Sequence, residues 1–414
     1  MNEAKQKFRL TSLERAWILY DVGNSAFVLL VATLIPIFFN ALAEGGGLSS
    51  VEYLAYWGYA ASAVTVIPAV LSPILGTLAD TRNFKKPIFT FCVAVGVIGC
   101  CAMGMASTWL PFLLIFIFAK VGFSGSLVFY DSMLSDVTVP DRMDEVSSKG
   151  YAWGYIGSCV PFVVCLALVL GAGSIGISQM TALNLALFIT AAWWLVTTLP
   201  LLRQYKQVHF VEVQEHAIRQ SFARIGHTLR HLKEDRQVFW FLLAFFCYID
   251  GVYTIIDMAT AYGTALGLDT TGLLLALLVT QIVAFPSALV FGRLSGQYPS
   301  GTLIPVCIAA YAGIALFAFF LKHQWQFWVL AVVVGMFQGG IQALSRSHFA
   351  KIIPPEKSGE YFGLFDICGK GASFLGTMIV SVGSQLTGSA NVGVGSLIVL
   401  FIVGFVLFRV SDRK

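Results

Sequence analysis

Stretches of about twenty apolar residues, separated by short polar segments, recur from one end of this chain to the other. A helix of about twenty residues crosses the hydrocarbon core of a bilayer, which is about 30 Å thick. Inside that core every backbone N–H and C=O group must be hydrogen-bonded within the protein, and a helix achieves this within its own segment. The pattern therefore predicts an all-α integral membrane protein.

Composition supports this fold class. Hydrophobic residues make up 57% of the 414 residues and charged residues only 12%, whereas about 25% of a soluble protein is charged. The first apolar stretch is too long for a signal peptide and lacks a small-residue cleavage pattern, so we expect it to remain as a span. Twelve transmembrane helices are predicted, at about residues 15–41, 53–79, 88–107, 110–134, 149–171, 180–201, 238–263, 271–293, 302–321, 326–348, 360–385 and 391–409.

Lysine and arginine residues gather in alternate connections between these spans, with Lys322 as the exception. Connections rich in such residues stay on the cytoplasmic side of a membrane. The cationic segments precede span one, follow spans two, four, six and ten, and close the chain. We therefore expect a multi-pass protein of the cell membrane with both termini in the cytoplasm. The net charge of +4 follows from this topology and indicates no nucleic-acid partner.

One long polar connection separates six spans from the other six. It divides the chain into an N-terminal bundle (1–201), a linker (202–237) and a C-terminal bundle (238–414). One helical face of the linker is apolar and the rest is basic, which predicts an amphipathic helix on the cytoplasmic membrane surface, with a regulatory partner site as the alternative. The apolar face consists of Ile218, Phe222, Ile225, Leu229 and Leu232.

Four short segments recur in the same order in both halves. The matched pairs are 76–88 with 292–304, 125–140 with 339–354, 150–154 with 359–363, and 20–25 with 249–254. The last pair aligns Asp21 with Asp250. Such matches indicate parallel repeats about an axis along the membrane normal. We expect two pseudo-symmetric six-helix bundles that face each other across a central cavity.

Ionisable side chains inside the predicted spans are the first functional candidates. Each costs at least ~2.5 kcal/mol near mid-membrane, so it normally faces the protein interior or a water-filled path. Polar stripes accompany them on the same helical faces. The charged candidates are Asp21, Lys120, Asp131, Asp250, Asp257, Asp366 and Lys370, and the polar candidates beside them are Asn24, Gln338 and Gln342.

Both signs of charge suit a transport site. Lys120 and Lys370 can receive a carboxylate or phosphate group of a substrate. Asp250 and Asp257, seven residues apart on one helical face, can receive an ammonium group or a proton. A buried aspartate opposite a lysine can alternate between holding a proton and pairing with the cation, which would couple proton movement to substrate charge.

Structural ion pairs are the alternative for several of these groups. Asp131 is expected within reach of Arg82, and Asp366 can pair with Lys370 one turn further along its helix. Asp21 lies close to the cytoplasmic end of its span, where gating, structure and proton binding are all open roles.

Two motifs remain for the gate and the cavity wall. In "GTLADTRNFKKP" (76–87), a glycine that permits close helix approach, Asp80 near a helix N-terminus and the basic cluster that begins at Arg82 can brace a cytoplasmic gate. The alternative is a basic turn between two spans. In "GYAWGYIG" (150–157), Tyr151 and Tyr155 can line the cavity, or the small residues can serve packing alone.

Nothing in the sequence indicates an enzyme. It contains no phosphate-binding Gly-Lys motif and no HExxH motif. All eight cysteines lie in apolar spans, and the six histidines lie in the linker or at span ends. We expect no cofactor and no metal site.

The twelve spans and "GTLADTRNFKKP" resemble the major facilitator superfamily, although Thr81 and Phe84 depart from its loop signature. "WILYDVGNSAF", "SSKGYAWGYIG", "QALSRSHFAKIIP" and "EYFGLFDICGKGASFLG" together resemble its vacuole-effluxer-like branch, also called the unknown major facilitator group. Val22, Gly23 and Thr377 depart from that branch's motifs. The resemblance covers nearly the whole chain. It implies rocker-type alternating access around a central site, and fungal relatives export amino acids from the vacuole.

We therefore expect a secondary transporter that moves a small polar solute, an amino acid or similar zwitterion, by proton-coupled alternating access. A sodium ion could replace the proton, and the two-bundle plan needs no second copy of the chain. One alternative is a transporter of small organic or phosphorylated anions that uses Lys120 and Lys370. Another is a lipid or lysolipid flippase, and a non-transporting receptor is the last.

Overall fold

The computed structural model describes residues 9–212, 230, 232 and 235–412, and twelve of its helices are long and apolar enough to cross a membrane. The predicted span count is therefore confirmed. The first half contains α1 (Ser12–Ala32), α2 (Leu34–Gly45), α3 (Ser50–Ala79), α4 (Lys85–Met103), α5 (Trp109–Ser132), α6 (Leu134–Val137), α7 (Pro140–Leu170) and α8 (Gln179–Gln204). The second contains α10 (Arg236–Ala265), α11 (Thr270–Leu294), α12 (Ser300–Phe319), α13 (Gln324–Ile352), η1 (Pro355–Lys357), α14 (Ser358–Thr387), α15 (Ala390–Gly395) and α16 (Ile398–Ser411).

Two predicted spans are each divided into two helices. Span one breaks at Thr33, between α1 and α2. Pro36 explains this break, because proline donates no backbone hydrogen bond and its ring clashes with the carbonyl group four residues earlier. Span twelve breaks between α15 and α16. Span five is longer than predicted, because α7 begins at Pro140, where proline suits the first helical turn.

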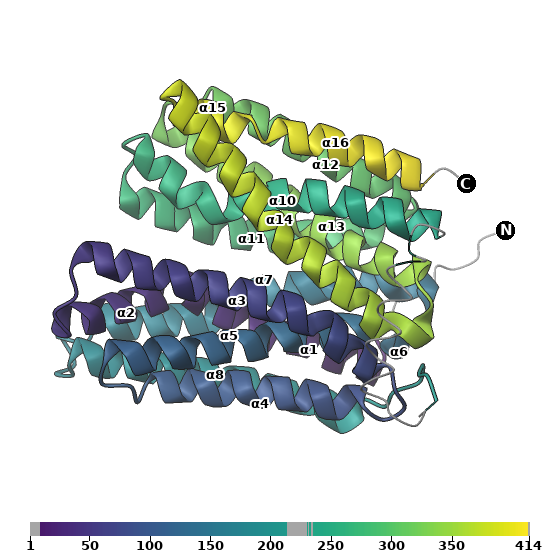
Figure 1. Cartoon of the computed structure of the whole chain (residues 1–414), viewed down its shortest axis with the longest axis horizontal. Helices are drawn as coiled ribbons and strands as arrows, with labels where there is room; N and C mark the ends of the chain where they lie inside the picture. Colours follow the sequence, from purple (N-terminus) through teal and green to yellow (C-terminus); the bar gives the residue numbers. More distant parts are fainter. Residues whose placement is uncertain (1–8, 213–229, 231, 233–234, 413–414) are drawn as a thin grey trace.

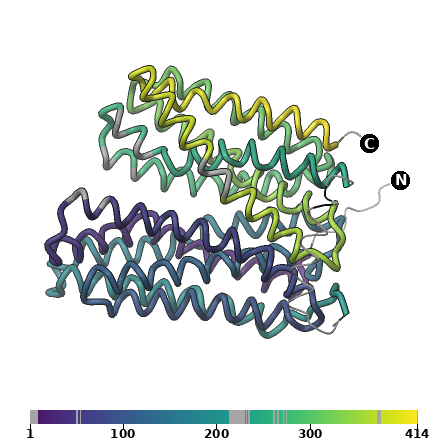
Figure 2. The backbone as a smooth tube through the Cα atoms, in the orientation of Figure 1, coloured from purple at the N-terminus to yellow at the C-terminus, as the bar shows by residue number. Residues whose placement is uncertain are grey.

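The helices form two bundles, α1 to α8 and α10 to α16 (Figure 1). The bundles lie close together where α1 begins and α16 ends, called the terminal end below, and diverge toward the far end near α2 and α15 (Figures 1 and 2). The two most extensive contacts between them are those of α3 with α14 and of α7 with α11, and α7 also packs on α13 and α5 on α14. Helices α3 and α11 are the second spans of their halves, and α7 and α14 are the fifth. The α3–α14 and α7–α11 pairs are therefore equivalent, which agrees with the predicted repeat.

The described part of the linker packs on the N-terminal bundle. Val211 bridges to Thr81 in the α3–α4 connection, and the N–H of Arg82 donates to the Val211 carbonyl at 3.1 Å. The predicted amphipathic helix at 218–232 lies almost entirely outside the described residues.

Candidate functional site

Arg346 links the two bundles near the terminal end. It extends from α13 of the C-terminal bundle, and its side chain is only 3% exposed. Its guanidinium group donates to Asp131 of α5 at 3.0 Å, lies 3.7 Å from the carboxylate of Asp21 on α1, and donates to the Ser147 hydroxyl of α7 at 2.9 Å. One cation thus holds three helices of the opposite bundle.

Aromatic rings enclose this cation. The guanidinium carbon lies 4.6 Å from the ring centroid of Trp17 and 4.3 Å from that of Tyr151. Trp17 is fixed by stacking on Tyr130 and by a 2.9 Å hydrogen bond to its carbonyl. Cation–π attraction is stronger where water is excluded. Removing one member of such a buried pair costs ~3–5 kcal/mol, because the other charge is left without a partner.

The structure corrects the expected partner of Asp131. Arg82 instead lies on the surface, where it pairs with Glu212 at 3.6 Å. Sequence reasoning does not identify Arg346 as a site residue, because it belongs to the cationic segment after span ten that sets the topology. Its position one turn after Gln342 on the same polar stripe was the available signal.

A second group of charges lies between the bundles at mid-height. Lys120 of α5 interacts electrostatically with Lys370 of α14 and Asp257 of α10. Asp257 is exposed, and both lysines are partly exposed. Among the described residues, no carboxylate lies within ion-pair distance of Lys120, whose ammonium group sits 4.6 Å from the Phe123 ring centroid. This cluster can receive charged groups of either sign.

The Asp366–Lys370 pair that the spacing suggested is present on α14. Asp366 also accepts a hydrogen bond from Ser72 of α3 at 2.7 Å. Lys370 is therefore partly neutralised, and its carboxylate partner touches the opposite bundle.

Asp250 does not join the Lys120 cluster. It is fully buried against α14, where Oδ1 accepts the Gly376 N–H at 2.8 Å and the Thr254 hydroxyl at 3.4 Å. A Cβ at position 376 would lie 2.7 Å from this oxygen, so glycine is what lets α14 approach. The sequence repeat aligns Asp250 with Asp21, but no cation corresponding to Arg346 contacts it in the described part of the chain.

The polar candidates make hydrogen bonds or close contacts within the protein and do not face an open cavity between the bundles. Asn24 is buried and donates to the Tyr20 carbonyl of its own helix at 3.1 Å. Tyr155 donates to Gln342 at 2.8 Å, which joins α7 to α13 across the interface. Gln338 is buried beside Tyr155.

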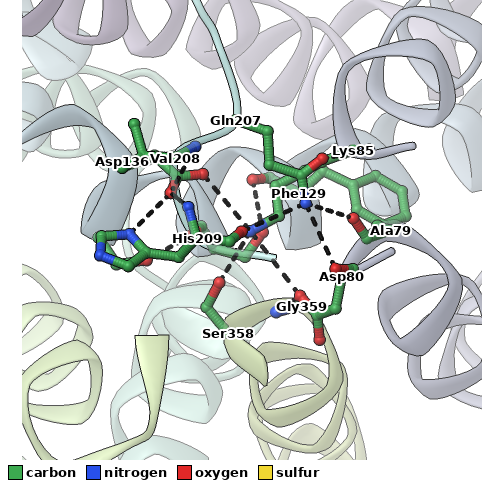
Figure 3. Close-up of polar contacts among 12 residues, drawn as sticks. Ala79, Asp80, Lys85, Phe129, Asp136, Gln207, Val208, His209, Ser358 and Gly359 are labelled. Atoms are coloured by element: carbon green, nitrogen blue, oxygen red, sulfur yellow. Dashed lines mark hydrogen bonds and ion pairs between the residues drawn. The ribbon is translucent and has the colours of Figure 1, made fainter. Parts of the chain in front are cut away.

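Asp80 joins α3 to α14 at the terminal end (Figure 3). Its carboxylate accepts the backbone N–H groups of Gly359 at 2.7 Å and Glu360 at 2.8 Å. These groups belong to the first turn of α14, and a negative charge is favoured at the N-terminus of a helix. Lys85 lies 3.8 Å from Asp80 and donates to Ser358 at 2.8 Å. Burial raises the pKa of Asp80 to about 7, although Lys85 and the two N–H groups oppose the rise.

Asp136 holds the start of the linker against the same cluster (Figure 3). It accepts the Tyr205 hydroxyl at 2.5 Å and the His209 N–H at 2.8 Å, and Lys85 lies 3.7 Å away. Asp136 and His209 were not among the predicted residues, since nothing in the sequence brings the linker to the end of α5.

The sequence is similar to a known protein family and to named relatives. Residues 12–138 and 135–414 match the model of a family described as vacuole effluxer Atg22 like. A Bacillus subtilis protein named "uncharacterized MFS-type transporter YxiO" is 42% identical over 404 residues, covering 96% of this chain and 94% of its own. Autophagy-related protein 22 of Coccidioides immitis is 25% identical over 315 residues, covering 65% of this chain and 51% of its own. The chain thus matches about half of the fungal protein.

Solved structures share the fold. The major facilitator superfamily transporter FucP, crystallised in an outward conformation, has a TM-score of 0.72 at 16% identity and covers 97% of this chain and 98% of its own. The human organic anion transporter MFSD10 also has a TM-score of 0.72, at 13% identity, with 96% and 98% covered. These structures confirm the predicted fold of two six-helix bundles.

Proposed function

Because the chain belongs to the vacuole effluxer Atg22-like family of major facilitator superfamily transporters, we propose that it is a secondary active transporter of a small polar solute. The proposed solute is an amino acid or a similar zwitterion. The observation that carries this proposal is the cluster of Lys120, Lys370 and Asp257, which brings both signs of charge from two bundles to one place.

In this proposal, Lys120 receives the substrate carboxylate and Asp257 receives its ammonium group. Lys120 is suited to an anionic group because no described carboxylate already neutralises it. A group bound between α5 and α10 contacts both bundles, so its binding energy can differ between states of the transporter.

Proton coupling is assigned to Asp21 and Asp131. Both carboxylates belong to the N-terminal bundle, and their shared cation, Arg346, belongs to the C-terminal bundle. Protonation of either one weakens the link that holds the terminal end closed. Asp80 and Asp366 add contacts between the bundles and act as gating groups. We place the terminal end in the cytoplasm because basic residues gather there.

Uptake into proteoliposomes of labelled amino acids under an imposed pH gradient tests the proposal. Lys120→Ala and Asp257→Asn should each abolish saturable uptake, whereas Lys322→Ala, at an exposed lysine, should not. Full uptake by Lys120→Ala would refute the assigned site. Gradient-driven accumulation that persists in Asp21→Asn would exclude proton coupling through that residue.

A small organic or phosphorylated anion is the second candidate, because Lys120 and Lys370 lie within electrostatic range of each other. Transport of such anions that is lost in Lys120→Ala but retained in Asp257→Asn would favour it. Movement of a headgroup-labelled lipid, with no uptake of soluble solutes, would replace both proposals with a flippase.

A further inference from the structure

A cavity of about 60 Å³ lies inside the C-terminal bundle, toward the far end. Its lining comes from α10 to α15 and Leu397, and no described residue of the N-terminal bundle contributes to it. About 10–15 Å³ of such space holds one water molecule. The cavity therefore has room for a small molecule of about one ring and is separate from the charged cluster between the bundles.

The lining is mainly aliphatic and aromatic. Two of its polar residues are satisfied within the protein: the Thr280 hydroxyl donates to the Ala276 carbonyl at 3.0 Å, and the Thr254 hydroxyl donates to Asp250.

Gln281 and Gln338 are the amide side chains of the lining, and Gln338 is the one that is buried with an unpartnered oxygen. Gln338 is only 5% exposed, and its side-chain oxygen Oε1 has no hydrogen-bond partner. A buried acceptor without a donor costs about 1–3 kcal/mol. A ligand that brings one donor to this oxygen removes that cost.

We propose that this cavity binds a small apolar molecule that carries one hydroxyl or N–H group, with Gln338 as the acceptor. Only the C-terminal bundle encloses the site. A molecule held there moves with that bundle when the bundles rock and is not passed between them, which sets it apart from the transported solute.

The amine aniline is the probe, and benzene, which lacks the donor, is its matched control. Both are titrated into the full-length protein in lipid nanodiscs, with empty nanodiscs subtracted. Saturable binding of the amine is expected. Ala331→Phe and Val334→Phe, which fill the cavity from α13, should abolish it. Val329→Phe, at a position on the same helix that is 42% exposed, should leave it unchanged.

Gln338→Leu tests the polar contact. It should weaken binding of the amine by about 2- to 10-fold, as the loss of one hydrogen bond predicts, without weakening that of benzene. Binding that survives in both cavity-filling variants, once thermal unfolding shows that they fold, would overturn the site. Equal losses for the two probes in Gln338→Leu would overturn the role of Gln338. None of these outcomes depends on transport activity.

Discussion

Gly76→Ala should open the terminal end by forcing α3 away from α14. A methyl group at position 76 would lie 2.7 Å from the carbonyl carbon of Gly359, whereas carbon atoms pack at about 3.5–4.0 Å. The two backbones must therefore separate by about 1 Å. The Asp80 carboxylate, now 2.7 Å from the Gly359 N–H nitrogen, would move beyond the ~3.2 Å range of a hydrogen bond.

The free-energy change follows from these contacts. Asp80 accepts two charge-assisted hydrogen bonds from the start of α14, each worth about 1.5–3 kcal/mol. Losing both at the lower value costs about 3 kcal/mol, which shifts the equilibrium between closed and open terminal ends about 100-fold.

Spin labels at Phe84 and Glu356, which are exposed on either side of this contact, report the separation. Gly76→Ala should move the distance distribution to longer values. Gly58→Ala is the matched control, because a Cβ at that position of the same helix meets no atom within 4 Å. Identical distributions for wild type, Gly58→Ala and Gly76→Ala would show that the α3–α14 contact does not hold the closed state.

Three further changes test other parts of the structure. Burial raises the pKa of Asp80 to about 7, above the ~3.9 of an exposed carboxyl. The closed state therefore binds the extra proton, and its gain in stability is complete below pH ~3.9 and lost as the pH rises through about 7. On acidification the spin-label distances should therefore shift toward the closed state, and Asp80→Asn should remove this shift. Arg346→Lys should lower the unfolding free energy by about 3 kcal/mol, because lysine cannot span the contacts of the guanidinium group, and adding Asp131→Asn should recover part of the loss in a double-mutant cycle. Tyr205→Phe should speed hydrogen exchange of the His209 amide at least about tenfold, since it removes a charge-assisted bond to Asp136.

The span count could be predicted because each span meets the same requirement of length and polarity. Motif reasoning expected Asp80 near a helix N-terminus. Asp80 lies at the C-terminal end of α3, and the N-terminus that it contacts is that of α14 in the other half of the chain, which a local turn does not predict. Breaks within spans were harder to foresee. Pro36 divides its span, but Pro161 and Pro286 lie inside continuous helices, where neighbouring helices compensate for the lost hydrogen bond.

Contacts between the bundles could not be predicted from spacing. Asp131 lies in the first half and Arg346 in the second, so their pairing depends on how the halves face each other. Asp250 shows the same limit. Helical spacing puts it on a face with Asp257, but the absence of a side chain at Gly376 lets α14 cover it.

The repeat accounts for packing at the terminal end but not for its charges. Gly76 and Gly292 occupy matched positions, and each permits a close contact, Gly76 with α14 and Gly292 with Ser148 of α7, where a Cβ would lie 2.8 Å from the serine Cβ. The position that matches Asp80 is Gly296, which has no side chain to accept the N–H groups of a facing helix. Hydrogen bonds to a buried carboxylate therefore hold the α3–α14 contact, whereas at the matched position of the α7–α11 contact Gly296 provides no carboxylate for such bonds. Because these bonds must break when the terminal end opens, the α3–α14 contact sets more of the free-energy cost of opening than its pseudo-symmetric counterpart.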